Sequence, residues 1–185
     1  MARIVYSMMV SLDGYIAGPD GDIGLPVPEE ALHRHFNDMM EQTSMELCGR
    51  RMYEVMRFWD SPEREDSDSK LERDFAHAWQ KTPKIVFSTT LREVGPNARL
   101  MNGDAENLAS VLKLEKDGYI SVAGAELAAH LARANLIDEY RLYMHPVVLG
   151  GGKPYFRSGL SLSLKPLGTE SLPQGVTLLR YAPVA

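Results

Sequence analysis

The order of secondary-structure elements that recurs along the chain is clearest in one short stretch, Ser121-Val122-Ala123-Gly124-Ala125-Glu126-Leu127. An apolar run of strand length ends in a tight turn of small residues, and a segment with helical spacing of its apolar residues follows directly. This order of strand, turn and helix is typical of an α/β domain, in which helices cover a largely parallel sheet.

The same alternation recurs along most of the chain. We expect strands over five ranges: Arg3 to Val10, Met45 to Cys48, Lys84 to Ser88, Tyr119 to Val122 and Glu139 to Leu149. Between them, apolar residues recur at the spacing of a helix that buries one face. We expect four such helices, around Leu32 to Met40, Leu71 to Trp79, Leu108 to Leu112 and Leu127 to Ala134.

The final part of the chain follows a different pattern. Residues Leu160 to Leu167 alternate between apolar and polar side chains, Pro173 and Gly175 indicate a turn, and Val176 to Tyr181 has the composition of a returning strand. This predicts an antiparallel hairpin at the edge of a mixed sheet. Residues 61–70 are charged and predict a surface loop rather than a domain boundary, so we expect a single domain over residues 1–185.

The composition is that of an ordinary globular domain. Of 185 residues, 44% are apolar and 24% charged, and 20 basic against 25 acidic residues give a net charge of −5. Lysines and arginines form only scattered pairs, which argues against a nucleic-acid partner. The single cysteine, Cys48, can form neither an internal disulfide nor a zinc site by itself, which favours a reducing compartment, most simply the cytoplasm.

The N-terminal apolar run, Ile4 to Leu12, has the outline of a signal peptide. Ser7 and Ser11 interrupt it and no small-residue cleavage site follows, so we expect a buried first strand instead. The longest uncharged stretch elsewhere, Leu142 to Gly152, is far shorter than the roughly 20 apolar residues that span a bilayer. We therefore expect no membrane partner.

The first candidate binding site follows the second strand, at Gly49, Arg50 and Arg51. A helix is expected to begin there, and its N-terminus offers unpaired N–H groups and the positive end of the helix dipole. Gly49 would let a ligand approach closely and the arginines add positive charge, so a phosphate suits this place. Alternatively, Arg50 and Arg51 are surface residues in ion pairs.

Two further strand ends are suited to a nucleotide. The hydroxyl run Ser88, Thr89 and Thr90 either caps the following turn or binds a phosphate ester such as the 2′-phosphate of NADP. The small residues at Ala123 to Ala125 either admit a pyrophosphate to the helix N-terminus or serve helix-to-sheet packing alone. Because open α/β sheets bind ligands at strand ends, three such ends on one edge predict a dinucleotide site.

The usual dinucleotide fingerprint is absent. After the first strand, glycines fall at positions 14, 18, 21 and 24, and no helix opens directly behind them. This spacing disfavours a Rossmann fold. We expect the stretch Leu12 to Gly24 to be a long loop that forms a lid over the site.

Three segments together resemble a known family. They are Ser11-Leu12-Asp13-Gly14-Tyr15-Ile16-Ala17, then Gly49-Arg50-Arg51 with Tyr53 and Glu54, and finally Leu136 to Leu142 leading to Pro146-Val147-Val148-Leu149-Gly150-Gly151-Gly152-Lys153-Pro154 and Phe156. They are similar to the dihydrofolate-reductase-like superfamily, above all to the reductase domain of the bifunctional riboflavin-biosynthesis deaminase/reductase and its stand-alone relatives. The similarity runs in order through essentially the whole chain, although the zinc deaminase half of the bifunctional enzyme has no counterpart here.

The resemblance implies a mixed, mostly parallel sheet of about eight strands flanked by helices on both faces, with NADPH bound across the strand ends. Carried over by position, Gly49, Arg50 and Arg51 would hold phosphates, and Ser88 and Thr89 would hold the adenosine end with its 2′-phosphate. The pyrophosphate would lie at Gly124, Ala125, Glu126 and Leu127, and the lid residues Ile16 and Ala17 would border the nicotinamide. Family members are commonly homodimers, so the resemblance also implies a twofold dimer.

One position departs from the family. Its members usually carry consecutive glycines after the strand that ends near Ala123, whereas here Gly124 stands between Ala123 and Ala125. Each added methyl group could clash with the cofactor, which would weaken NADPH binding.

Two carboxylates are candidates for the substrate side. In the folate-reducing branch a carboxylate on the helix after the lid binds the pterin through hydrogen bonds. Glu30 lies near the corresponding position of this chain. Alternatively, Glu30 is an acid that the helix dipole favours in a first turn. Asp13 is the other candidate, with a turn-forming role next to Gly14 as its alternative.

These observations predict an NADPH-dependent reductase that transfers a hydride to a small heterocyclic or sugar-linked substrate, of the riboflavin-pathway type. Dihydrofolate reduction, a non-catalytic nucleotide-binding homodimer and a flavin in the same cleft are the alternatives. We expect no metal, because His33 and His35 do not share a helix face and His145 lies within a strand.

Overall fold

The computed structural model describes residues 1–184, which fold around an eight-stranded sheet with a small two-stranded sheet beside it. The strands are β1 (Arg3–Ser11), β2 (Tyr15–Ala17), β3 (Thr43–Gly49), β4 (Lys84–Phe87), β5 (Ala98–Met101), β6 (Tyr119–Ala123), β7 (Glu139–His145), β8 (Lys153–Pro154), β9 (Leu164–Ser171) and β10 (Thr177–Pro183). The helices are α1 (Glu30–Glu41), α2 (Arg50–Met56), α3 (Pro62–Glu65), α4 (Lys70–Lys81), α5 (Ala105–Glu115) and α6 (Ala125–Arg133), with the 3-10 turns η1 (Arg57–Asp60) and η2 (Pro173–Gly175).

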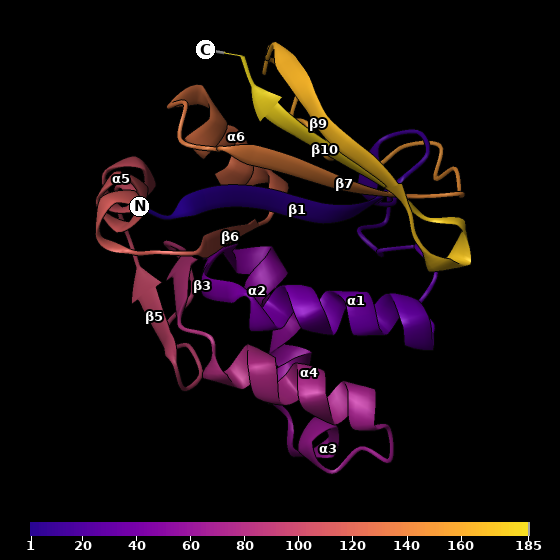
Figure 1. Cartoon of the computed structure of the whole chain (residues 1–185). Helices are drawn as coiled ribbons and strands as arrows, with labels where there is room; N and C mark the ends of the chain where they lie inside the picture. Colours follow the sequence, from indigo (N-terminus) through magenta and orange to yellow (C-terminus); the bar gives the residue numbers. More distant parts are fainter. Residues whose placement is uncertain (185) are drawn as a thin grey trace.

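The main sheet has the strand order β5-β4-β3-β6-β1-β7-β10-β9. The first six strands in this order run parallel, whereas β10 pairs antiparallel with both β7 and β9. The predicted mixed, mostly parallel sheet and its terminal hairpin are confirmed (Figure 1). Because the six strands are parallel, their carboxyl ends all meet at one edge, which we call the carboxyl edge.

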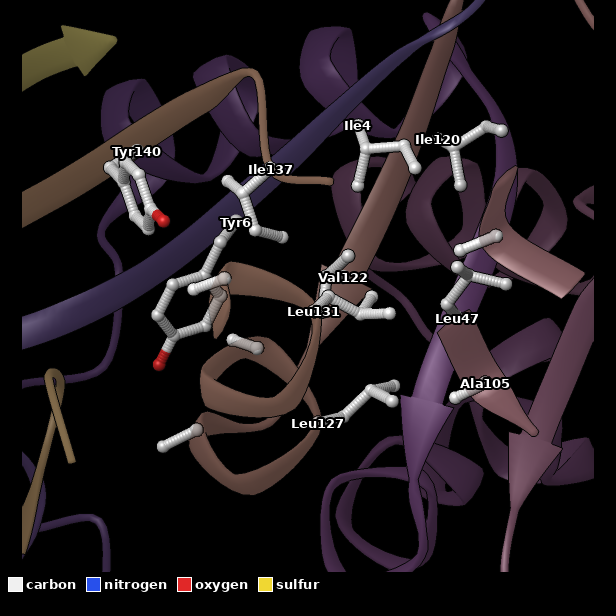
Figure 2. Packing of buried hydrophobic residues seen from close by; sticks show 14 of the residues in the cluster. Ile4, Tyr6, Leu47, Ala105, Ile120, Val122, Leu127, Leu131, Ile137 and Tyr140 are labelled. Atoms are coloured by element: carbon white, nitrogen blue, oxygen red, sulfur yellow. The ribbon is translucent and has the colours of Figure 1, made fainter. Parts of the chain in front are cut away.

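Helices cover both faces of the sheet. On one face α5 and α6 pack on alternate residues of β1 and β6, as Figure 2 shows for Ile4, Ile120 and Leu131. On the other face α1, α2 and α4 lie together (Figure 1), and Trp79 of α4 packs there with Cys48 and Val86. Parallel strands buried on both sides need apolar residues at nearly every position, which explains the continuous apolar runs in the sequence.

Three sequence expectations need correction. The lid predicted as a continuous loop contains β2, which pairs antiparallel with β8. The strand expected to reach Leu149 ends at His145, since Pro146 has no backbone N–H for a ladder. The charged segment 61–70 includes the four-residue helix α3, which starts at Pro62 because proline is preset for a first helical turn.

Candidate active site

A pocket of about 430 Å³ opens at the carboxyl edge, where β4 and β5 end. Its lining brings together four residues that the sequence analysis named, Arg50 and the hydroxyl run Ser88 to Thr90, with Asn102 and Gly103 from the next strand end. The pocket therefore combines a guanidinium, hydroxyl groups and a glycine, which are groups that suit a phosphate ester.

Two of these side chains already have partners. The Oγ of Ser88 accepts hydrogen bonds from the backbone N–H of Thr90 at 3.1 Å and of Leu91 at 3.0 Å, so it caps the turn after β4. Arg50 donates to Glu54 at 3.3 Å on an exposed helix surface. Such an exposed pair contributes little to stability, so it leaves Arg50 available to a stronger anion.

The turns after β3 and β6 abut one another at this edge. Gly124 has φ +114, and a Cβ built there would lie 3.7 Å from the Cβ of Met52 and 3.8 Å from the backbone N of Gly49. Helix α6 begins immediately after Gly124, so the backbone N–H groups of its first turn lie beside Gly49. Only a residue that tolerates positive φ fits here, which explains the glycine at position 124.

The residues on either side of Gly124 point away from the edge. Ala123 is buried with the α4 helix cluster, and Ala125 and Leu127 are buried in the main core, where Figure 2 shows Leu127. The extra methyl groups at positions 123 and 125 therefore face the interior. Any contribution of Ala125 or Leu127 to a ligand would come from the backbone N–H alone.

A second group of cations, Lys153, Arg51 and Arg157, lies near the start of α6, and of these three the sequence analysis selected only Arg51. Burial lowers the pKa of Lys153 on β8; the nearby Glu126 opposes this shift, while Arg51 and Arg157 reinforce it. Arg157 also pairs with Glu126 at 3.3 Å. Lys153 and Arg157 thus share one carboxylate, and Arg51 lies close enough to Lys153 to affect its pKa. In the sequence, Lys153 stands directly after three glycines, within one of the segments that carry the family resemblance.

The lid is tied to the β7–β8 loop through Asp13. One carboxylate oxygen accepts from Ser11 Oγ at 2.6 Å and from the backbone N–H of Leu149 at 3.1 Å, and the other accepts from the N–H of Gly150 at 2.7 Å. The hydrogen bond from Ser11, together with the two backbone donors, lowers the pKa of Asp13. Beyond Asp13, Ile16 is buried, and Ala17 pairs with Lys153.

Two other titratable residues lie apart from the edge pocket. Glu30 is exposed in the first turn of α1 and pairs with Arg34 at 2.8 Å, and it lines neither of the two pockets described in this section. His145 is buried, and burial lowers its pKa. Its Nε2 atom has no hydrogen-bond partner among residues 1–184.

A second pocket, of about 360 Å³, lies between α1 and the sheet. Its lining includes His35 and Met39 from α1, Ser7 from β1, and Arg141 and Tyr143 from β7. The hydroxyl of Tyr143 lies 3.1 Å from Nε2 of His35 and donates to the sulfur of Met39 at 3.4 Å. None of these residues was selected from the sequence as a candidate site residue, because they lie on three separate elements.

Among residues 1–184, no group of three or more His, Cys, Asp or Glu side chains gathers as a metal site would require. Over the same residues, no helix is both long and apolar enough to cross a bilayer.

Comparison with known proteins agrees with this architecture. Residues 2–178 match the RibD C-terminal domain. The uncharacterized protein YyaP of Bacillus subtilis strain 168 is 31% identical, with 97% of this chain and 94% of YyaP covered. Among solved structures, a putative riboflavin biosynthesis protein from Shewanella sp. PV-4 has a TM-score of 0.76 and 25% identity, and both chains are covered in full.

Two more distant structures are similar in fold. A diaminohydroxyphosphoribosylaminopyrimidine deaminase/5-amino-6-(5-phosphoribosylamino)uracil reductase from Thermotoga maritima has a TM-score of 0.65 and 16% identity, and the match covers 99% of this chain and 57% of that one. A dihydrofolate reductase from Enterococcus faecalis, complexed with NADP(H), has a TM-score of 0.67 and 14% identity, with 99% of this chain and 97% of that one covered. The fold is therefore dihydrofolate-reductase-like, as the sequence resemblance implied.

Proposed function

The chain belongs to the family of the RibD C-terminal domain, and on that premise we propose that it is an NADPH-dependent reductase of the riboflavin-pathway type. It would transfer a hydride to a small heterocyclic or sugar-linked substrate such as 5-amino-6-(5-phosphoribosylamino)uracil. The observation that carries the proposal is the carboxyl edge, where the phosphate-suited pocket and the abutting turns at Gly49 and Gly124 lie along one line of strand ends. Open α/β sheets bind nucleotides at this kind of edge.

The residues at the edge fit a dinucleotide phosphate. We assign the adenosine end with its 2′-phosphate to the pocket lined by Arg50, Ser88 and Thr89. The pyrophosphate would lie where Gly49 meets Gly124, because small residues and the N-terminus of the nine-residue helix α6 let an anion approach the backbone there. Arg51, a residue of the second cation group, would add positive charge to the phosphates.

The lid would close over the nicotinamide end, with Ile16 and Ala17 beside the ring. When bound, NADPH supplies the hydride, and the protein supplies position and a dry environment. Three hydrogen bonds lower the pKa of Asp13, so this carboxylate is ionised near neutrality and is a poor proton donor. We therefore propose that Asp13 holds the lid in place and that the proton comes from water.

The test of this proposal is a substrate comparison. Oxidation of NADPH is followed with 5-amino-6-(5-phosphoribosylamino)uracil and, in parallel, with dihydrofolate. We expect turnover with the first compound and much slower turnover with the second. Oxidation of NADPH with dihydrofolate alone would favour the alternative activity, and no oxidation with either would reject the proposed reaction. The same preparation, analysed by sedimentation, tests the proposed homodimer.

A further inference from the structure

The pocket under α1 contains a patch of positive charge on the sheet face. Cross-strand pairing puts Ser7 of β1 opposite Arg141 of β7, and Arg141 opposite Arg180 of β10. Directly paired residues in neighbouring strands point to the same face, so these three side chains stand in one row. All three line the pocket, together with Ser121 and Tyr119 of β6.

The two arginines share one buried carboxylate. The Nε of Arg141 donates to Oε1 of Glu139 at 2.8 Å, and the Nε of Arg180 donates to the same oxygen at 2.7 Å. Arg3 donates to the other oxygen at 2.9 Å, and Glu139 itself is 0% exposed. Three guanidinium groups therefore surround a single carboxylate, which leaves two positive charges in excess.

The geometry also leaves hydrogen-bond donors for a ligand. Within residues 1–184, Arg141 and Arg180 bind Glu139 only through Nε, and their terminal nitrogens donate to no other group. A guanidinium has five N–H donors in a planar fork that matches a carboxylate or a phosphate. Because Glu139 fixes both side chains, little side-chain entropy would be lost when an anion binds to them.

Acidic side chains also occur at this pocket, but they lie at its rim. Asp38 of α1 and Glu170 of β9 line it and are exposed, so water screens their charges. The side chain of Arg141 is only 14% exposed, and its guanidinium stands over the ring of Tyr119 at 5.1 Å. Charges at the less solvated floor of a pocket act more strongly than those at the rim. His35 and Tyr143 complete the set of titratable groups that face the row.

We propose that this pocket binds an oxyanion, the phosphate or carboxylate group of a small molecule, between Arg141 and Arg180. The site is separate from the carboxyl edge, and the proposal does not depend on the reductase assignment. The hydroxyls of Ser7, Ser121 and Tyr119 would add neutral hydrogen bonds around the bound group.

The test is a titration of isotope-labelled protein with inorganic phosphate and, separately, with acetate, at constant ionic strength, followed by backbone amide chemical shifts. We expect saturable shifts at residues 7, 121, 141 and 180 with at least one of the two anions. The anion that binds more tightly identifies the group. Absence of saturation with both anions would overturn the proposal, as would shifts confined to residues 49–52 and 88–90.

Variants separate the row from general charge effects. Arg180→Met should weaken the binding at least about tenfold, because it removes a charged donor. Arg133→Met, the same change at an exposed position on α6, should leave it unchanged. Ser7→Asp keeps both arginines and places a competing carboxylate beside Arg141, so it should abolish binding even if Arg180→Met does not fold. Unchanged binding in Ser7→Asp would contradict the site.

Discussion

The carboxylate of Asp13 accepts a hydrogen bond from the backbone N–H of Gly150 at 2.7 Å, and this contact joins the loop after β1 to the loop after β7. The two loops are far apart in the sequence, yet both leave the carboxyl edge of neighbouring strands. The backbone continues the junction, since Leu12 donates to the carbonyl of Val147 at 2.7 Å and Tyr155 donates to that of Gly14 at 2.9 Å. The lid is therefore anchored at its base.

Asp13→Ala should loosen this anchor. Three hydrogen bonds to the carboxylate would be lost, so we expect faster amide hydrogen exchange across residues 12–18 and 147–152. If the protein is the proposed reductase, Asp13→Ala should also bind NADPH more weakly, because Ile16 and Ala17 would no longer be held beside the nicotinamide. Asp20→Ala, at an exposed position of the same loop, is the matched control. Equal exchange rates in wild type and Asp13→Ala would show that the carboxylate does not anchor the lid to the loop after β7.

Gly152→Ala should be strongly destabilising. Gly152 has φ +120, and a Cβ there would overlap the carbonyl oxygen of Ala17 and stand 2.8 Å from the Cα of Gly18. Gly159 has φ +75 with nothing within 4 Å of a built Cβ, so Gly159→Ala measures the conformational strain alone. That strain is worth roughly 1–3 kcal/mol. Urea unfolding should show a larger loss of stability for Gly152→Ala than for Gly159→Ala. Equal losses would mean that Gly152 is not in close contact with Ala17 and Gly18.

The turn after β6 allows a test of whether the alanines beside Gly124 affect cofactor binding. Ala125→Gly should lower the free energy of unfolding by about 1 kcal/mol, because a buried methyl group is lost and glycine gives the unfolded chain more backbone freedom. It should not tighten NADPH binding. Gly124→Ala should instead weaken NADPH binding, because its methyl would stand 3.8 Å from the backbone N of Gly49. Dissociation constants from fluorescence titration check both. Tighter binding in Ala125→Gly would show that the methyl faces the cofactor after all.

Glu46 should make the stability depend on pH. Burial raises its pKa to about 7, a shift that a hydrogen bond from Ser121 and the charge of Lys84 oppose. A raised pKa means that the folded state holds the proton more tightly than the unfolded state. The stabilisation is therefore complete below pH 4.5, the ordinary value, and is lost as the pH rises to about 7.

The measurement is the free energy of unfolding of wild type and Glu46→Gln between pH 5 and pH 7. We expect the difference, wild type minus variant, to fall by about 2 kcal/mol over this range, because the slope stays below 1.36 kcal/mol per pH unit as Glu46 titrates. Glu115→Gln, a change on the exposed surface of α5, should give a constant difference. A constant difference for Glu46→Gln as well would mean that Glu46 stays ionised beside Lys84.

The main strands could be predicted because each is a buried apolar run in sequence. Strand β5 was missed, since Ala98–Met101 is short and lies at the sheet edge with side chains only partly buried. The pairing of β2 with β8 was also missed, because two or three residues have no measurable periodicity. Their pairing depends on tertiary contact, in particular on the space that Gly152 leaves for Ala17.

The candidate edge site was largely accessible to sequence reasoning, because Gly49, Ser88 and Gly124 each lie at the carboxyl end of a strand and parallel strand ends meet. The pocket under α1 was not. Arg141 and Arg180 stand in ordinary polar positions of two strands, and only the pairing register of β7 with β10 brings them together. The prediction for Glu30 rested on position along the chain; the side chain is exposed and pairs with Arg34, and its role toward a substrate stays a prediction.

The proposed reaction requires that NADPH binds along the carboxyl edge. The most direct test titrates the protein with NADPH and with NADH, following the fluorescence of Trp59 and Trp79, and repeats both titrations with Arg50→Ala and Arg51→Ala. We expect saturable NADPH binding, much weaker NADH binding, and a clear loss of NADPH affinity in at least one variant. Absence of binding by either nucleotide, or equal affinities in wild type and both variants, would contradict it.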